Sequence, residues 1–221
     1  DDADRSVMRE IFRLREYRIA EPAIATAKSP ILDVGAHAGF FSIYCHVLNP
    51  LVKIFAIEPL QENLEALAEN FKINKIKGVK VMEAALAGAT EKRKLVVTED
   101  SHNNYLDSRF SAKGGSATQN DNVDSTVILA LCPAVALCEG GKAGIQKVVQ
   151  AYSFHDFCEK NKIKEVSLLK MDIEGGEYEV FDGMNSEDFI KISAIILEYH
   201  NGERKYNEIE NKLRENGFGV Q

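Results

Sequence analysis

Hydrophobic and polar positions along the chain follow two repeating patterns. Short runs rich in apolar and β-branched residues predict strands over residues 30–34, 52–58, 79–86, 92–97, 147–152, 166–174 and 192–200. Between these runs, apolar residues recur with a helical period, which predicts helices over residues 40–48, 60–74, 153–161, 175–184 and 205–217. Ser153 is a suitable N-cap for one helix and Gly217 a suitable end residue for another. The residues after Gly217 begin a further strand.

The order of these elements indicates the fold class. Strands that alternate with helices are typical of the α/β class, in which helices cover both faces of a mostly parallel sheet. Such sheets bind ligands at the carboxyl ends of their strands, near the point where the strand order reverses. Each motif described below falls at the carboxyl end of a predicted strand, so we expect one ligand site at that edge.

Two segments lie outside the alternation. The charged stretch 1–22 is amphipathic and predicts a helix on the domain edge, within an N-terminal helical extension over residues 1–29. Residues 98–146 are rich in Ser, Asn, Asp and Gly, with an apolar patch at 127–137 but no clear period. This segment is long for a connection inside a compact domain. We interpret it as an insertion or lid beside the active-site edge of a single domain, 1–221, with a loop of no function as the alternative.

Composition excludes several classes of function. The net charge of −7 argues against a nucleic-acid partner, and we interpret the lysines at 72–80 as an ordinary solvated surface. No run approaches the ~20 apolar residues that a membrane span needs. The four cysteines form no C-x-x-C pair, which is typical of reduced thiols in a cytoplasmic protein. The sequence carries no signal for an oligomeric state.

A glycine turn follows the first predicted strand, in the stretch I-L-D-V-G-A-H-A-G-F (31–40). Glycine lets the backbone approach a ligand closely and adopts positive φ without a Cβ clash. A dinucleotide site would have G-x-G-x-x-G here, but Asp33 stands in place of the first glycine, ahead of Gly35 and Gly39. An aspartate that points into the pocket would repel a pyrophosphate. It favours a ligand with positive charge, such as S-adenosylmethionine with its sulfonium and amino group.

A second acid ends the next predicted strand. Glu58 follows the glycine turn by about 20 residues, the spacing at which an acid accepts hydrogen bonds from both ribose hydroxyls. NAD sites use the same arrangement, so Glu58 does not choose between the two cofactors. Asp33 is the residue that favours S-adenosylmethionine.

Five motifs in fixed order extend this interpretation: ILDVGAHAGFFS, IFAIEPLQENLEALAENFKIN, VMEAALAG, LLKMDIEGGEYEVFDGM and IILEYH. With them the chain resembles the FkbM-type family of class I S-adenosylmethionine-dependent methyltransferases, over residues 30–97 and 147–221. K-M-D-I-E-G-G-E is the most characteristic motif, and His37 stands where the family usually has Asn. The resemblance implies a Rossmann-like sheet with a reversed last strand, and we expect this sequence to end before that strand.

The resemblance also implies a set of donor-binding residues. By analogy the segment 83–85 lies against the adenine, although ordinary packing at a strand end explains Ala84 and Ala85 equally well. The full predicted set comprises Asp33, Gly35, Ala36, His37, Gly39, Glu58, Pro59, Ala84, Ala85 and Asp172.

Polar residues also gather at the end of the predicted strand 166–174. Lys170, Asp172 and Glu174 share one face of that strand because side chains alternate. Asp172 is a candidate to contact the donor's amino group or to act as the base. Lys170 is a candidate to keep these acids ionised or to hold an acidic substrate. Glu174 and Glu177 open the next helix, where capping explains them as well as a site role does.

Glu198 and His200 close the strand 192–200 on one face. A histidine titrates near neutral pH and suits a general base for a sugar-like hydroxyl. We therefore predict His200, Asp172 and Lys170 as catalytic residues. His37 is a second candidate for contact with the acceptor or the donor carboxylate.

The same acids offer oxygen ligands for a divalent cation. Asp172, Glu174 and Glu198 with His200 are suitable for magnesium, but nothing in their spacing requires it. We predict no metal.

Methyl transfer to oxygen is the function that these residues favour. We predict an S-adenosylmethionine-dependent O-methyltransferase that acts on a hydroxyl of a small molecule, sugar or glycan, and this acceptor class comes from the resemblance alone. Two alternatives stay open: a non-catalytic S-adenosylmethionine-binding protein, and an NAD-dependent oxidoreductase.

Overall fold

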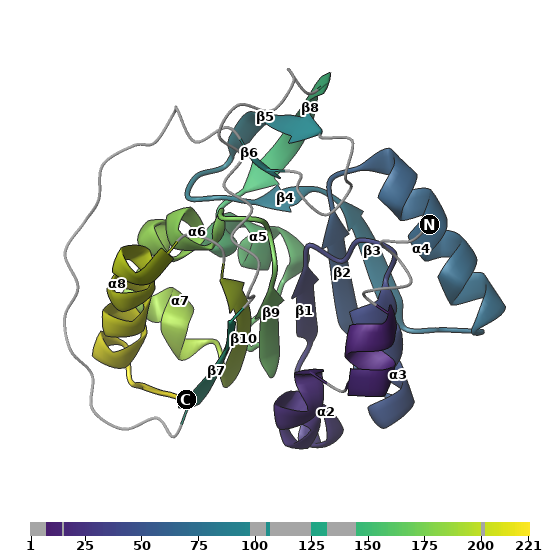
Figure 1. Cartoon of the computed structure of the whole chain (residues 1–221), viewed down its shortest axis with the longest axis horizontal. Helices are drawn as coiled ribbons and strands as arrows, with labels where there is room; N and C mark the ends of the chain where they lie inside the picture. Colours follow the sequence, from purple (N-terminus) through teal and green to yellow (C-terminus); the bar gives the residue numbers. More distant parts are fainter. Residues whose placement is uncertain (1–7, 15, 98–104, 107–124, 132–144, 200–201) are drawn as a thin grey trace.

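A central parallel sheet organises the molecule (Figure 1). The computed structural model describes residues 8–14, 16–97, 105–106, 125–131, 145–199 and 202–221. Seven strands pair in the order β11-β7-β10-β9-β1-β2-β3, and each recorded pairing in this sheet is parallel. They are β1 (Ile31–Val34), β2 (Ile54–Glu58), β3 (Val79–Glu83), β7 (Ser125–Leu131), β9 (Leu168–Met171), β10 (Ala194–Tyr199) and β11 (Phe218–Val220). The predicted α/β, Rossmann-like fold is confirmed.

Helices cover both faces of this sheet. In Figure 1, α2, α3 and α4 lie on one side of it and α5, α6, α7 and α8 on the other. Their bounds are α2 (Glu21–Thr26), α3 (Phe40–Leu48), α4 (Gln61–Ile73), α5 (Phe154–Asn161), α6 (Glu177–Gly183), α7 (Ser186–Ile190) and α8 (Gly202–Glu215). The predicted cap of α5 is confirmed, because the Ser153 hydroxyl accepts a hydrogen bond from the Asp156 N–H.

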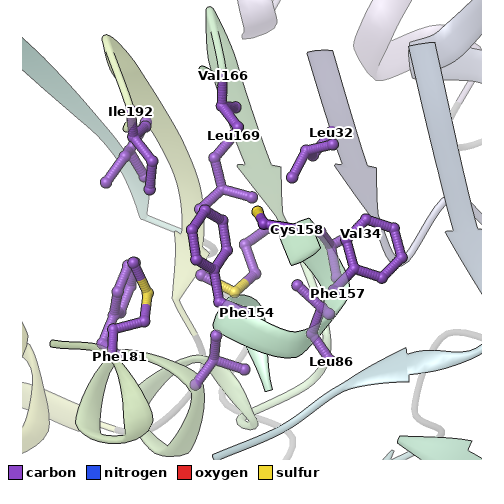
Figure 2. Packing of buried hydrophobic residues seen from close by; sticks show 14 of the residues in the cluster. Leu32, Val34, Leu86, Phe154, Phe157, Cys158, Val166, Leu169, Phe181 and Ile192 are labelled. Carbon is purple, nitrogen blue, oxygen red and sulfur yellow. The ribbon is translucent and has the colours of Figure 1, made fainter. Parts of the chain in front are cut away.

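Alternate residues of the strands enter two different cores. Leu32, Val34 and Leu169 pack with Phe154 and Phe157 on the α5 side, as Figure 2 shows. Ile31, Leu168 and Ile196 belong instead to the cluster on the α2 and α3 side. Burial on both faces explains why these strands read as continuous apolar runs.

A second, smaller sheet lies beyond one end of the central strands (Figure 1). It pairs in the order β4-β8-β5-β6, with β4 (Ala85–Leu86), β5 (Glu91–Val97), β6 (Tyr105–Leu106) and β8 (Ile145–Tyr152). Arg93 of β5 is buried and pairs with Glu91 at 2.7 Å and with Glu179 of α6 at 2.8 Å. This ion-paired group ties the second sheet to the helix that follows β9.

The strand predictions need three corrections. The predicted strand 79–86 divides at Ala84, whose N–H donates to the Glu58 carbonyl, so that β3 joins the central sheet and β4 the second sheet. The predicted strands 92–97 and 147–152 form the second sheet as β5 and β8. The predicted strand 166–174 ends at Met171, because Glu174 and Gly175 take positive φ values of 54° and 96°.

The predicted single helix over 1–22 is also wrong within the described residues. The chain forms a π-helix η1 (Arg9–Leu14), a 3₁₀ helix η2 (Glu16–Ala20) and then α2. Pro22 lies in the first turn of α2, and a proline has no N–H to continue a preceding helix.

Three further elements, α7, β6 and β7, were not predicted from the sequence. The short helix α7 is held by a capping box between Asn185 and Asp188 and is too brief to show a period. Strand β7 comes from the segment 98–146 and lies in the central sheet between β10 and β11. The reversed last strand that the resemblance implies is not among the described strands. No helix in the described ranges is long and apolar enough to cross a membrane.

Candidate active site at the carboxyl edge of the central sheet

A pocket opens where β1, β2 and β9 end. The residues that follow these three strands form much of its lining, and the strand order reverses between β1 and β9. The lining comprises Ile11, Tyr17, Val34, Gly35, Ala36, His37, Phe40, Phe41, Ile57, Glu58, Pro59, Leu60, Asn63, Ala84, Ala85, Leu86, Leu95, Lys170, Asp172, Ile173 and Glu174. The pocket therefore lies where parallel sheets commonly bind ligands.

Gly35 allows the turn after β1 to lie against the turn after β9. Its φ is +74°, and a Cβ at this position would stand 1.8 Å from the Asp172 carbonyl oxygen. The Gly35 and Ala36 N–H groups both donate to the Ile57 carbonyl, at 3.0 and 3.1 Å. The turn is thus pinned between the ends of β2 and β9, and only glycine leaves room for it.

Gly39 has a different role from the predicted one. Its φ is +83°, and it precedes α3, but it does not line the pocket. A Cβ there would lie 2.7 Å from the Phe71 ring and 3.0 Å from Leu67. Gly39 therefore allows α3 and α4 to pack closely, and its effect on the pocket is indirect.

Glu58 is a buried carboxylate in the pocket wall. Its Oε2 accepts a hydrogen bond from the His37 backbone N–H at 3.0 Å. Its Oε1 accepts from the Leu60 N–H at 2.9 Å and from the Asn63 amide at 3.1 Å. Burial raises the pKa of Glu58 above its ordinary value of 4.5, and these hydrogen bonds oppose that rise. A carboxylate has about four acceptor positions, so these three bonds leave room for a ligand hydroxyl.

Asp33 lies beneath the pocket rather than in its lining, which corrects the expectation that it points at the ligand. Its side chain is on the α3 face of β1, where Oδ2 accepts a 2.7 Å hydrogen bond from the Ser42 hydroxyl. Complete burial raises the pKa of Asp33, while Lys170 and Ser42 oppose the rise. Its influence on a ligand is therefore electrostatic and passes through Lys170.

Lys170 joins the ends of β1 and β9. The pairing register places it beside Asp33 on one side and Ile196 on the other. Its Nζ donates to the Gly35 carbonyl at 3.0 Å and lies 3.5 Å from Asp172 Oδ2 and 3.7 Å from Asp33 Oδ1. Burial alone would lower the pKa of Lys170, but Asp172, Asp33 and Glu198 together raise it. Lys170 is held as an ammonium, which supports the prediction that it keeps neighbouring acids ionised.

The turn after β9 is built by its own acids. Glu177 is buried, and its Oε1 accepts hydrogen bonds from the Ile173 and Gly175 N–H groups at 3.0 and 3.2 Å. Glu177 does not line the pocket, so the capping explanation holds for it. Asp172 and Glu174 do line the pocket.

The structure brings together most of the predicted donor-binding residues. Those that share the pocket are Gly35, Ala36, His37, Glu58, Pro59, Ala84, Ala85 and Asp172, with the predicted catalytic Lys170 beside them. His200 lies outside the described residues, so its predicted role as the base is not placed. No group of three or more His, Cys, Asp or Glu side chains within the described ranges is arranged to hold a metal ion.

Several lining residues escaped the sequence analysis. Ile11 and Tyr17 come from η1 and η2, Phe40 and Phe41 from the start of α3, and Leu95 from β5. All of these are apolar or aromatic, and such residues look like ordinary core in a sequence. Phe41 and Tyr17 illustrate this, since both also pack within a buried cluster.

The family can now be stated. The methyltransferase FkbM domain matches residues 33–220, a span that contains every strand of the central sheet except the first two residues of β1. This chain belongs to the FkbM methyltransferase family. As a member of the family, it is a methyltransferase.

Similar proteins carry methyltransferase names. Methyltransferase sdnD of Sordaria araneosa is 24% identical over 226 residues, which cover 97% of this chain and 82% of that protein. The 31-O-demethyl-FK506 methyltransferase FkbM of Streptomyces tacrolimicus is 24% identical over 201 residues, covering 86% and 72%. Among solved structures, precorrin-6y C5,15-methyltransferase from Geobacter metallireducens GS-15 has a TM-score of 0.45 at 14% identity, over 91% of this chain and 70% of that one.

Proposed function

We propose that this member of the FkbM family transfers the methyl group of S-adenosylmethionine to a hydroxyl of a small molecule, sugar or glycan. The negative charge of the pocket lining is the observation that supports S-adenosylmethionine as the donor. Glu58, Asp172 and Glu174 line it, and Lys170, the lysine among the lining residues, is already engaged by Asp172 and the Gly35 carbonyl. An acidic lining favours a ligand with a sulfonium and an ammonium and disfavours a pyrophosphate.

The residues present fit such a donor. Glu58 has acceptor capacity left for a ribose hydroxyl, and Ala84 and Ala85 offer a small-residue surface on which a flat base can lie. The turn at Gly35 and Ala36, with Asp172 across it, is the place for the amino acid part of the donor. His37 and Pro59 complete the proposed donor-binding set. The bound donor supplies an activated methyl group, and the chain must hold the acceptor oxygen in line with it.

The choice of oxygen as the acceptor atom is supported by a relative and by the candidate bases. The name of the Streptomyces tacrolimicus relative, 31-O-demethyl-FK506 methyltransferase, describes a methyl transfer to oxygen. A carboxylate or imidazole near the pocket edge is the kind of base that a hydroxyl acceptor needs, and Asp172 and His200 are the proposed candidates. Lys170 acts on Asp172 through its charge.

A cytoplasmic location belongs to the same proposal. Cys45 and Cys158 are buried free thiols. Burial raises the pKa of the Cys158 thiol to about 12, so that it stays protonated and unreactive at neutral pH. These are properties of structural thiols in a reducing compartment.

An acceptor screen tests the reaction. The protein is incubated with trideuteromethyl S-adenosylmethionine and a panel of alcohols, phenols and sugars, and each mixture is analysed by mass spectrometry. We expect a product heavier by one trideuteromethyl group, together with S-adenosylhomocysteine, and NMR should place the new methyl on oxygen. A methyl group found on nitrogen or carbon would contradict the proposal.

Glu58 gives the most direct prediction for donor binding. Glu58→Gln should weaken S-adenosylmethionine binding by about 1.5–3 kcal/mol, the range for hydrogen bonds to a charged group. Titration calorimetry on the folded variant measures this. Glu62→Gln is the matched control, because Glu62 lies four residues further on, in the first turn of α4, but its side chain is 67% exposed and outside the pocket lining. Equal affinities for the two variants would remove Glu58 from the donor site.

The base is tested by two variants measured side by side with an acceptor from the screen. His200→Ala should lower turnover by about 10²–10⁴-fold with little change in donor affinity, because loss of a general base acts on the transition state. Asp172→Ala should weaken donor binding and turnover together if Asp172 holds the donor's ammonium. A His200 variant with normal turnover, beside an Asp172 variant that binds donor but is inert, would make Asp172 the base.

A further inference from the structure

The N-terminal segment forms a wall of the pocket that the proposed position of the donor leaves free. If the adenosine part lies along Glu58, Ala84 and Ala85, as proposed, the rest of the lining includes Ile11 of η1 and Tyr17 of η2. Phe40 and Phe41 of α3 line the pocket too, and the Tyr17 and Phe41 rings have centroids 4.9 Å apart. We refer to Ile11, Tyr17, Phe40 and Phe41 together as the N-terminal wall.

The side chains of this wall are apolar or aromatic, and none carries a charge. Ile11 is only 3% exposed and Tyr17 only 9%, so both are held in place by packing. The Tyr17 hydroxyl is 3.5 Å from Glu198 Oε2, at the carboxyl end of β10. The negative charge of Glu198 in turn helps to raise the pKa of Lys170. The wall therefore meets the charged end of the pocket at Tyr17.

The segment has distinct inner and outer positions. Ile11 and Tyr17 face inward, whereas Met8, Phe12, Leu14 and Ile19 are between 41% and 54% exposed. Neighbouring residues of similar chemistry thus differ in whether they touch the pocket. Leu14 is the best control for Ile11, because both are aliphatic residues of η1 and only Ile11 lines the pocket.

We infer that the N-terminal wall holds the methyl acceptor, and that this acceptor carries an apolar ring or chain beside the hydroxyl that it presents. Ile11 and Tyr17 are then specificity-determining residues. This inference rests on the proposed function, because the position of the donor defines which lining is left for the acceptor. It narrows the acceptor from the wider set of small molecules, sugars and glycans to apolar alcohols and phenols.

The physical reason is the cost of burying unpaired hydroxyls. A ring or chain gains from leaving water when it contacts Ile11 and the aromatic rings. A polyol in the same place would lose hydrogen bonds to water that these side chains do not replace. Apolar pockets reject an added hydroxyl by only about 10²-fold, so the preference should be clear but not absolute.

The test uses two hydroxyl probes of opposite character. The protein is first titrated with S-adenosylhomocysteine, and the saturated complex is then titrated with 2-naphthol and with methyl β-glucopyranoside. Naphthol fluorescence and calorimetry report the two affinities. We expect 2-naphthol to bind at least about tenfold more tightly than the glucoside. This difference in affinity is within the ~10²-fold by which an apolar pocket rejects an added hydroxyl. This arm uses the unaltered chain and needs no variant to fold.

Variants then locate the binding surface. Ile11→Asn should weaken 2-naphthol binding at least about tenfold, with S-adenosylhomocysteine affinity unchanged, because a polar amide replaces a wall contact. Leu14→Asn should change neither affinity. A second pair of variants serves if Ile11→Asn does not fold. Tyr17→Phe keeps the ring and should keep the affinity for 2-naphthol within about threefold of the unaltered protein. Tyr17→Ala removes the ring and should weaken 2-naphthol binding at least about tenfold.

Each result decides between the claims. Equal or tighter binding of the glucoside would overturn the inference, as would equal losses in the Ile11 and Leu14 variants. If S-adenosylhomocysteine binding is normal, either of these two results would contradict the inference about the acceptor without contradicting the proposed function. Absence of S-adenosylhomocysteine binding in the unaltered protein would overturn the proposed function and this inference with it.

Discussion

Gly35→Ala is expected to abolish S-adenosylmethionine binding and to destabilise the fold by about 4 kcal/mol or more, the range of the most damaging single substitutions. The added Cβ would stand 1.8 Å from the Asp172 carbonyl oxygen, at a φ of +74°. A backbone atom cannot rotate away from a clash as a side chain can. The turns after β1 and β9 must therefore separate, and both belong to the proposed donor site. Calorimetry with the donor and urea unfolding measure the two effects.

Gly217→Ala is the matched control for this substitution. Gly217 also has a positive φ, +88°, but nothing lies within 4 Å of the Cβ that alanine would add. Its cost should be limited to the strain of the left-handed conformation, about 1–2 kcal/mol, with donor binding intact. Comparable losses in the two variants would mean that backbone strain, and not the contact with Asp172, is what matters at Gly35.

Lys170→Met is expected to cost about 3–5 kcal/mol of stability at neutral pH, the range found when one partner of a buried ion pair is removed. Methionine keeps much of the length of the side chain but leaves Asp33 and Asp172 without the ammonium. Lys170 is 5% exposed as a side chain and lies between both carboxylates. Urea unfolding at several pH values measures the loss.

The pH dependence of that loss follows from the sign of the pKa shifts. Burial already raises the pKa of Asp33 in the folded protein above 3.8, and removal of Lys170 takes away an interaction that lowers it. The folded variant then takes up a proton at a higher pH than the unfolded chain does. The deficit should be complete above the raised folded pKa and should shrink as the pH falls through it. A deficit that is constant with pH would show that lost packing, and not unpaired charge, is responsible.

Lys212→Met serves as the control for Lys170→Met. Lys212 lies 3.3 Å from Asp182, but the two side chains are 26% and 45% exposed. Exposed pairs of this kind contribute about 0–1 kcal/mol, so this variant should lose little stability at any pH. A loss as large as that of Lys170→Met would contradict the special role of the buried cluster.

Much of this site was predictable because strand ends in a parallel sheet meet at one edge. Gly35, Glu58 and Asp172 are far apart in sequence, yet each lies at or directly after the end of an apolar strand, and that position alone predicts a shared location. The alternation of side chains also predicted that Lys170 and Asp172 share a face. Periodicity did not reveal what surrounds the Asp33 side chain, so Asp33 was expected to point at the ligand, whereas it accepts a hydrogen bond from Ser42.

The N-terminal wall was not predictable for a different reason. Ile11 and Tyr17 reach the pocket only because η1 and η2 pack against α3, which is a long-range contact with no local signal. Their sequence suggested one continuous amphipathic helix, whereas the chain forms two short helices, η1 and η2, before α2 begins at Glu21. The position of β7 was hidden in the same way, since the apolar patch at 127–137 gives no direction or partner strand. Local pattern sets the elements, while contacts between distant segments decide which side chains complete a pocket.

Two parts of the proposed donor site differ in how they bear on the choice of cofactor. An acid at the end of β2 suits any ribose, so Glu58 is compatible with both S-adenosylmethionine and NAD. The turn after β1 distinguishes them, because a pyrophosphate needs free N–H groups there. The Gly35 and Ala36 N–H groups instead donate to Ile57, and the carboxylates of Asp172 and Glu174 are nearby in the same lining.

Titration calorimetry of the purified chain with S-adenosylmethionine, S-adenosylhomocysteine and NAD tests the central claim most directly. The account predicts saturable one-to-one binding of the first two, with loss of that binding in Gly35→Ala, and no binding of NAD over the same concentrations. Binding of NAD, or the absence of heat with both S-adenosyl compounds, would contradict it.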